Sequence, residues 1–481
     1  MSTPPAPLRR PPLLPLDLLA LLGLMLLLVL AACWEPAPLL SALALALWAL
    51  VIARALRLRT AAMVMLSPFL LLHLSVMASL IAIESGAYMK EIGATGAPSL
   101  AGVLYPLLSL LFVGAALLAH GFWGRRLTPV RPLPDVPAAP APWWLLNAAL
   151  LLGAGADLLL LAKGLVGGFP MLSGTDRFQF RASTDVLTLN LLNLKIVIAA
   201  ALATGALAAR SLRARRAHHL LFGSYLLLSF LYGDKFFNIL VAALVYAMPA
   251  AAADPVRLRH HAARLAPLVL TLLLAVMAAT LVSYSNQGEL SLAQTLERLG
   301  ERVAGQGQLW WVAMRDNAQW LAWDGEALRG YLASLWANPA ASYVFEHRLV
   351  AFYFIERYAP AAMHLSFLHN KGTVTPTMVF EAYSLVLMGG VGVILATACA
   401  GLFTGSALHW LQRQMLKGQV VNVLLPAYVL IQTFYLMAQA TLYNLISPSA
   451  AKAYLAFLAL QGLVWAWLRL SAAPRLEPAH G

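Results

Sequence analysis

The chain has 481 residues, of which 61% are apolar and only 11% are charged, and its mean hydropathy is +0.75. Because soluble domains carry about 25% charged residues, this composition excludes a fold surrounded by water. The net charge of +13 does not indicate nucleic-acid binding, because most basic residues stand in short loops between apolar runs and no nucleic-acid motif accompanies them.

Apolar runs of about 20 residues, the length that crosses a bilayer, recur along the chain. They predict an all-α polytopic membrane protein with about 12 transmembrane helices and a large outward-facing helical loop between helices 9 and 10. The predicted helices are Leu13–Cys33, Leu39–Ala55, Ala61–Ile83, Leu100–His120, Trp143–Gly164, Asp185–Ala208, His219–Tyr232, Lys235–Met248, Leu265–Ser283, Met378–Thr404, Val420–Ile446 and Ala451–Leu470. The seventh and eighth are too short to span fully, and they meet at the sequence Tyr-Gly-Asp-Lys of residues 232–235.

The distribution of Lys and Arg predicts the orientation, because cytoplasmic loops are enriched in both. Arginine-rich loops, such as those at 54–59 and 210–216, alternate with loops that hold few basic residues. Both termini are therefore expected in the cytoplasm. We expect one integrated membrane domain. Residues 1–283 would hold helices 1–9, residues 284–376 the periplasmic helical loop, and residues 377–481 helices 10–12 and the cytoplasmic tail.

The outward loop is not a plain linker. Ser291-x-x-Gln294 is a capping-box pattern, and apolar residues follow it at helical spacing. Five tryptophans come next, namely Trp310, Trp311, Trp320, Trp323 and Trp336. Most of them are expected to anchor helices at the membrane interface, while a sugar-stacking role for one or two stays open.

Charged residues inside or beside a span are costly and are candidates for function. Asp157 and Lys195 stand in adjacent predicted helices at similar depths, so the sequence favours a buried ion pair between them. A packing role for this pair is preferred to a chemical one, because buried ion pairs often fix the register of helices.

Three basic residues are candidates for binding an anion. Arg177 and Arg181 stand four residues apart in the outward loop before the sixth helix, and planar guanidinium groups suit phosphate oxygens. Lys235 stands at the helix break, near the N-terminus of the eighth helix, where an anion is favoured. The alternatives are local ion pairs, of the arginines with Asp176 and of Lys235 with Asp234.

A second candidate group lies late in the outward loop. His347 takes a proton near neutral pH, Glu346 is a possible proton acceptor, and Arg348 suits phosphate. Successive residues of a helix differ by about 100° in direction, so not all three can face one cavity. His364 and His369 remain rival histidines, and for each histidine a surface or packing role is the alternative.

Taken together, these features resemble the Wzy-type polymerases of bacterial surface polysaccharides, in the O-antigen polymerase and ligase superfamily. The resembling parts are the Arg177/Arg181 loop, Gly233-Asp234-Lys235 between short helices, the large late loop, residues 302–311, the His347-Arg348 pair, and residues 375–383 followed by Gly389, Gly390 and Gly392. The chain departs from the Arg-x10-Gly spacing of some members, because Thr188 stands where glycine would follow Arg177.

The resemblance implies metal-independent glycosyl transfer on the periplasmic side of the bacterial inner membrane, with undecaprenyl-diphosphate-linked oligosaccharide as donor and acceptor. It assigns diphosphate binding to Arg177, Arg181, Lys235 and Arg348, the catalytic base to His347 or Glu346, and contacts with the acceptor glycan to Arg302, Gln308 and Trp311. No cofactor or metal is expected. A chain-length regulator is a candidate partner, and nucleic acid is not.

Two other functions stay open. A related ligase would transfer a finished glycan to lipid A core. A twelve-helix flippase or transporter would suit the same helix count, but it should show two matching halves, which the sequence lacks. The first outward loop, residues 34–38, lacks an Asp-x-Asp pair, which argues against metal-dependent polyprenyl-phosphate glycosyltransferases.

Overall fold

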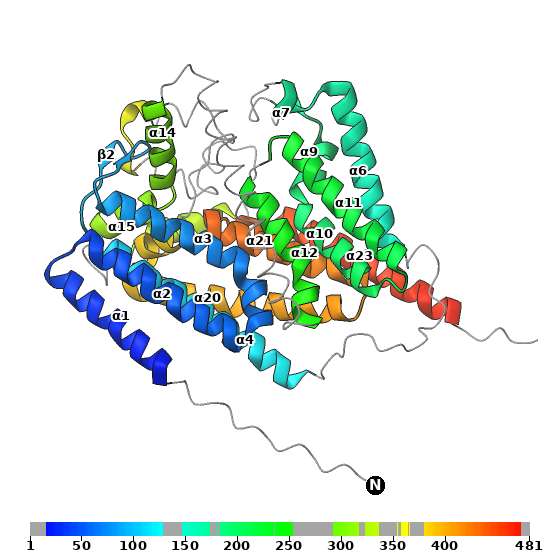
Figure 1. The fold of residues 1–481 in the computed structure, drawn as a ribbon, viewed down its shortest axis with the longest axis horizontal. Helices are drawn as coiled ribbons and strands as arrows, with labels where there is room; N and C mark the ends of the chain where they lie inside the picture. Colours follow the sequence, from blue (N-terminus) through cyan, green and yellow to red (C-terminus); the bar gives the residue numbers. More distant parts are fainter. Residues whose placement is uncertain are drawn as a thin grey trace, which may run out of the picture.

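The computed structural model describes residues 16–127, 147–173, 183–234, 236–253, 292–316, 323–335 and 380–472, with 180, 354, 357–363 and 365. Helices dominate this part of the chain (Figure 1), and its only strands are two residues long. These strands, β1 (Tyr88–Met89) and β2 (Ala94–Thr95), pair antiparallel in one hairpin. The described part is therefore all-α, as the composition predicts.

The helices are α1 Leu16–Trp34, α2 Pro38–Leu58, α3 Thr60–Glu84, α4 Ala101–Arg126, α6 Ala148–Gly167, α7 Pro170–Ser173, α9 Val186–Asn193, α10 Lys195–Ala208, α11 Leu212–Leu231, α12 Phe236–Ala253, α14 Leu292–Ala304, α15 Gln308–Asp316, α16 Gly325–Ser334, α20 Phe380–Leu416, α21 Val420–Gln439, α22 Tyr443–Ile446 and α23 Pro448–Ala472. Within the described residues, eight helices are long and apolar enough to cross a membrane, or nine if α9 and α10 form one bent span. The predicted ninth helix, Leu265–Ser283, lies outside the described residues.

Helices α11 and α12 differ from the two half-spans that the sequence predicts. α11 begins at Leu212, inside the arginine-rich segment, because the Ser211 side chain caps it by accepting a hydrogen bond from Ala214 N at 3.1 Å. The two helices have 20 and 18 residues and are longer than predicted, but neither is among the described helices that are long and apolar enough to cross a membrane. The break between them is where the sequence places it, and Gly233 there has φ of 73°.

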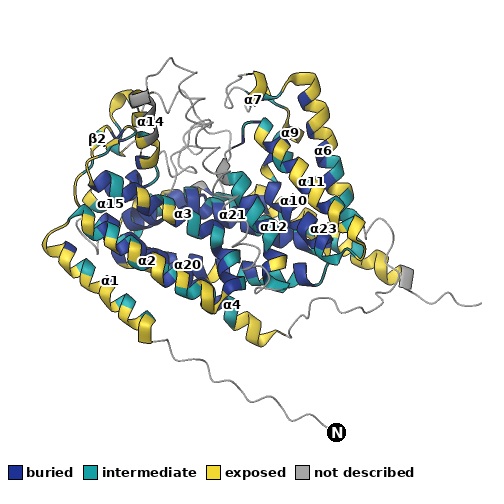
Figure 2. Cartoon of the chain, in the orientation of Figure 1, coloured by how far each residue is buried: buried dark blue, intermediate teal, exposed yellow. Residues whose placement is uncertain are grey.

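Apolar side chains cover the outside of several helices. Leu27 on α1 is 60% exposed and Leu463 on α23 is 70% exposed, and both helices show mostly exposed residues along their length (Figure 2). Surfaces of this size and character are not stable in water, and a lipid bilayer is the solvent that suits them.

The basic ends of three helices gather at one end of the bundle. α2 meets α3 at Arg59, and a Cβ on Gly121 of α4 would lie 3.3 Å from an Arg59 guanidinium nitrogen. α20 runs beside α4 in the same direction and ends near Arg413. We call this end the arginine side. The hairpin, α14 and α15 lie at the other end, which we call the loop side (Figure 1).

Among the described helices, α4 and α20 share the most extensive contact. Gly401 and Gly405 of α20 are one turn apart, and their backbones lie against the backbone of Phe112 and Ala116 on α4. A Cβ atom at either glycine would overlap with those carbonyl groups. In a membrane, where apolar side chains gain little by leaving lipid, such small-residue contacts allow the van der Waals packing that joins helices.

α20 also bends sharply before it reaches this contact. Gly389 adopts φ of 69° and ψ of −174°, a conformation that L side chains rarely adopt. The first two turns of α20, with Glu381 and Tyr383, are therefore directed differently from the long part that packs on α4.

Helix α15 attaches the loop side to the bundle through hydrogen bonds. The indole nitrogens of Trp310 and Trp311 donate to the backbone oxygens of Ala101 and Ala97 at 3.1 and 3.0 Å, and both side chains are buried. Their expected place at the membrane interface is thus wrong, because protein surrounds them. Trp323 is 69% exposed and agrees with that expectation.

The α4–α20 contact predicts a contrast between two identical substitutions. Gly401→Ala should lower stability by about 1–3 kcal/mol, because the methyl group must displace α20 from the Phe112 carbonyl. Gly114→Ala, on α4 with open space around its Cα, should leave stability unchanged or slightly raised. Thermal unfolding of the two detergent-purified variants measures this, and equal melting temperatures would contradict the close packing.

Candidate functional site

Two helix breaks meet in the half of the molecule formed by α6, α9, α10, α11 and α12. α9 and α10 are bent by 57° at Leu194, and α11 stops at Leu231 before α12 begins at Phe236. A helix break leaves backbone groups without their usual partners, which is tolerated within a membrane only where protein or a water-filled cavity receives them. The residues around these breaks are therefore candidates for a functional site.

An ion pair joins the two breaks. Lys195 is the first residue of α10, Asp234 lies in the turn before α12, and the Lys195 Nζ and Asp234 Oδ2 atoms are 2.5 Å apart. Their side chains are only 6% and 1% exposed. Asn238, one turn further along the chain, donates to the other carboxylate oxygen at 3.2 Å. Asp234 therefore balances the Lys195 charge where the two helix breaks meet.

The pairing that the sequence favours for Lys195 is wrong. Asp157 of α6 accepts a short hydrogen bond from the Ser224 hydroxyl of α11, and Lys195 turns to Asp234 instead. The sequence does not reveal Asp234 as the partner of Lys195, because the two residues come together only when α11 and α12 pack on α10. The alternative pairing of Asp234 with Lys235 stays a prediction, because Lys235 lies outside the described residues.

Tyrosine hydroxyls tie the backbone around both breaks. Tyr225 of α11 donates to the Leu191 oxygen of α9 at 2.6 Å, one turn before the α9–α10 bend. Tyr232, at the end of α11, donates to the Leu160 oxygen of α6 at 2.7 Å. The first bond supplies a partner for a carbonyl group beside the α9–α10 bend, and the second ties the end of α11 to α6.

Aromatic contacts bring a second chain segment to the break between α11 and α12. The Phe180 ring lies 5.3 Å from the Tyr232 ring, and the Phe169 ring lies 5.4 Å from it. Phe180 directly precedes Arg181, and Tyr232 stands three residues before Lys235. Phe180 and Tyr232 are therefore in contact, and each stands close in sequence to a predicted diphosphate ligand, Arg181 or Lys235.

The rim of this site is charged and exposed. Lys163 Nζ lies 3.3 Å from Asp185, which also caps α9 by accepting from Thr188 N at 3.0 Å. These hydrogen bonds from Thr188, with the nearby Lys163 charge, lower the pKa of Asp185 to about 2. The cap therefore stays ionised throughout the physiological range.

The predicted site residues fall into two groups. Arg177, Arg181, Lys235, Glu346, His347 and Arg348 lie outside the described residues. Arg302, Gln308 and Trp311 are described, and only Arg302 is exposed, on α14. Their assignment as acceptor contacts stays a prediction.

The polar atoms of Gln308 and Trp311 are directed to protein groups. Gln308 donates a short hydrogen bond to Glu91 of the hairpin loop, and Trp311 donates to Ala97. Burial against α15 raises the pKa of Glu91 to about 7, although the bond from Gln308 opposes this rise.

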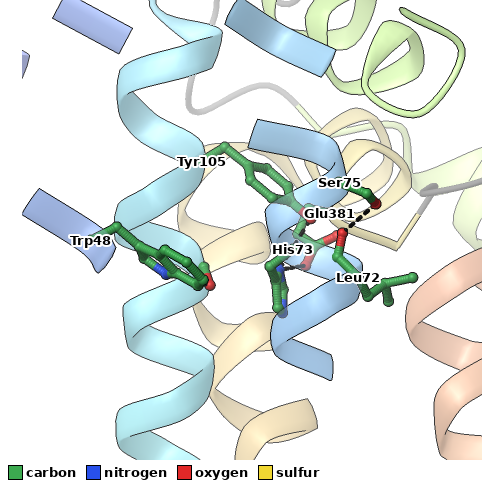
Figure 3. A network of polar contacts seen from close by, with 7 residues as sticks. Trp48, Leu72, His73, Ser75, Tyr105 and Glu381 are labelled. Carbon is green, nitrogen blue, oxygen red and sulfur yellow. Dashed lines mark hydrogen bonds and ion pairs between the residues drawn. The ribbon is translucent and has the colours of Figure 1, made fainter. Parts of the chain in front are cut away.

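A second polar cluster lies in the core between α3, α4 and the first turn of α20 (Figure 3). His73 Nδ1 is 3.2 Å from the Tyr105 hydroxyl and 3.9 Å from a Glu381 carboxylate oxygen. The Trp310 ring of α15 also contacts the Tyr105 ring, and the two ring centres are 5.7 Å apart. The cluster links the loop side to the bundle.

Sequence reasoning did not single out this cluster. The sequence pattern marks Glu381 only within the segment 375–383 and does not mark His73 or Tyr105. The signal was available, since a histidine and a glutamate inside predicted spans need polar partners.

Among the described residues, no group of three or more His, Cys, Asp and Glu side chains is placed to hold a metal ion. Comparisons with protein-family models, curated proteins and solved structures give no match to this chain.

The ion pair predicts a specific pattern of stability. Lys195→Met and Asp234→Asn should each lower the free energy of unfolding by about 3–5 kcal/mol, because each leaves one buried charge unbalanced. The double variant should recover much of this loss, since both charges are gone. The measurement is the folded yield and melting temperature in detergent.

A matched double variant separates the two possible pairings. Lys195→Met with Asp157→Asn should show no recovery, because Asp157 bonds to Ser224. Recovery in this variant, together with none in Lys195→Met/Asp234→Asn, would contradict the observed pairing.

Proposed function

We propose that this protein is a glycosyltransferase that polymerises lipid-diphosphate-linked oligosaccharide repeat units into a surface polysaccharide. In this reaction the bond between the anomeric carbon of the donor glycan and its phosphate oxygen breaks. A hydroxyl oxygen of the acceptor glycan bonds to that carbon, and its proton passes to His347 or Glu346 as base. The lipid diphosphate leaves with the electron pair of the broken bond.

The observation that carries the proposal is the contact between Phe180 and Tyr232. A leaving diphosphate gains negative charge in the transition state, so cations aimed at it stabilise that state more than the ground state. In the proposal, Arg177, Arg181 and Lys235 supply these cations together with Arg348. The contact supports this grouping because it joins the chain segments that bear Arg181 and Lys235.

The ion pair between Lys195 and Asp234 supports the same grouping in a second way. It is net neutral and nearly fully buried, so it fixes the turn without competing for the diphosphate. Positive charge offered to a ligand at this turn therefore comes from the neighbouring basic residues. The hydrogen bonds of Tyr225 and Tyr232 fix the same backbone, and preorganised donors are those that accelerate reactions.

In the proposal, residues of the loop side position the acceptor glycan. Arg302, exposed on α14, would contact the acceptor glycan. Gln308 and Trp311 would affect acceptor binding by holding α15 in place, because their polar atoms bond to Glu91 and Ala97.

One observation favours a second function, that of a transporter. Discontinuous helices that meet inside a membrane domain are typical of substrate sites in secondary transporters. The α9–α10 bend and the α11–α12 break form such a pair. A glycan ligase would use the same cations as the polymerase and differ only in its acceptor.

The test is elongation of a lipid-diphosphate repeat unit by purified protein in detergent. Arg181→Gln and Lys235→Gln should each lower the rate by roughly 10²–10³, the usual effect of losing one transition-state donor. Arg348→Lys should also lower it, because the planar fork is lost while the charge stays. Lys452→Gln, an exposed lysine on α23, is the matched control and should elongate normally.

Each alternative gives a different result. A ligase would form product only when a lipid A core acceptor is added. A transporter would form no new glycosidic bond in detergent, and its variants would fail only in vesicle uptake or flipping. Full elongation by Arg181→Gln and Lys235→Gln would contradict the diphosphate site.

A further inference from the structure

A large apolar groove runs along the outside of α20, separate from the two helix breaks. It has a volume of about 1020 Å³, at the upper end of the range of about 300–1,000 Å³ for small-molecule pockets. Its walls come from α4, α20, α21 and α23, and α16 and α22 close it on the loop side. Its length along α20 from Ala396 to Arg413 is about 26 Å at 1.5 Å per residue, close to the thickness of the hydrocarbon core.

The walls of the groove suit hydrocarbon chains. Ala400, Phe403 and Ala407 form one stripe of α20 at helical spacing, and Leu425 and Val429 of α21 face it. Phe403 is 45% exposed, so the groove opens to the surroundings of the bundle and not to its core.

The arginine of the groove lining, Arg413, lies on the arginine side. Arg413 and His409 line the groove one turn apart on the same face of α20. Both ring nitrogens of His409 are buried and have no hydrogen-bond partner among the described residues. Trp123 lies beside them, and its indole nitrogen donates to Ser406 at 2.9 Å.

This arrangement matches an amphiphile in both charge and polarity. An arginine offers paired hydrogen bonds to phosphate oxygens, and a histidine nitrogen can donate a further one. Tryptophans prefer the level of lipid headgroups, where one edge of the ring is polar and the rest apolar. The apolar stripe of Ala400, Phe403 and Ala407 would receive the hydrocarbon chains.

We propose that this groove is a binding site for an anionic glycerophospholipid, whose phosphate contacts Arg413 and His409 and whose acyl chains lie along Ala400 and Phe403. The site is independent of the proposed glycosyl transfer, because it uses none of its residues. The lipid would fill the space between α20 and α23, and α23 packs on α21 and α22.

The experiment is native mass spectrometry of the full-length protein titrated with phosphatidylglycerol, phosphatidylcholine or polyprenyl phosphate. Phosphatidylglycerol should bind about tenfold more tightly than phosphatidylcholine, because both lipids carry the same phosphate but the choline ammonium cancels the net negative charge that Arg413 attracts. Arg413→Gln should remove most of this preference. Arg469→Gln, an arginine that packs on Trp465 of α23 outside the groove, should keep it.

A second variant tests the hydrocarbon part of the site. Ala400→Phe fills the groove and should weaken phosphatidylglycerol binding while Arg413 stays in place. Equal binding of phosphatidylglycerol and phosphatidylcholine, or an unchanged preference in Arg413→Gln, would overturn the proposal. Tighter binding of polyprenyl phosphate, lost in Arg413→Gln, would overturn the phospholipid assignment and make the groove a polyprenyl site.

Discussion

A charge inside a bilayer has no water to stabilise it and needs a partner of opposite charge. Lys195 and Asp234 are such partners, and they form an ion pair where two helix breaks meet. Lys195 begins α10 at a 57° bend, and Asp234 lies in the turn between α11 and α12. The pair neutralises both charges and fixes the two turns to each other. Tyr225 bonds the Leu191 carbonyl group beside the α9–α10 bend, and Tyr232 ties the end of α11 to α6. The contact of Tyr232 with Phe180 depends on this fixed geometry.

The other half of the molecule solves a different problem, that of joining helices without a hydrophobic driving force. Gly401 and Gly405 let α20 approach the α4 backbone, which brings Glu381 at the other end of α20 to His73 and Tyr105. The α15 helix then covers this cluster through Trp310. Close packing in the bundle and burial of the loop side are therefore linked, so a change at α20 is expected to affect α15 as well.

Composition and run length were enough to predict an all-α membrane protein, and most helix limits agree to within a few residues. The break at residues 232–235 was also predictable, because Gly233 and two charges interrupt an apolar run. Pairings between distant residues were not, since Asp157 and Asp234 are equally plausible partners for Lys195 before the helices pack. Trp310 and Trp311 resemble interfacial residues in sequence, and only the fold reveals the backbone oxygens that they bind. The Gly401-x-x-x-Gly405 spacing was a signal that sequence reasoning passed over.

The central claim is that the segments bearing Arg181 and Lys235 meet at the α11–α12 break. Its most direct test is crosslinking of Phe180→Cys with Tyr232→Cys by a short bifunctional thiol reagent, after Cys33 and Cys399 are replaced by serine. The 5.3 Å ring separation predicts rapid crosslinking in the folded protein. Phe180→Cys with Tyr88→Cys, which joins the site to the distant hairpin, should not crosslink (Figure 1). Absence of a crosslink in the first pair, or equal crosslinking of both, would contradict the claim.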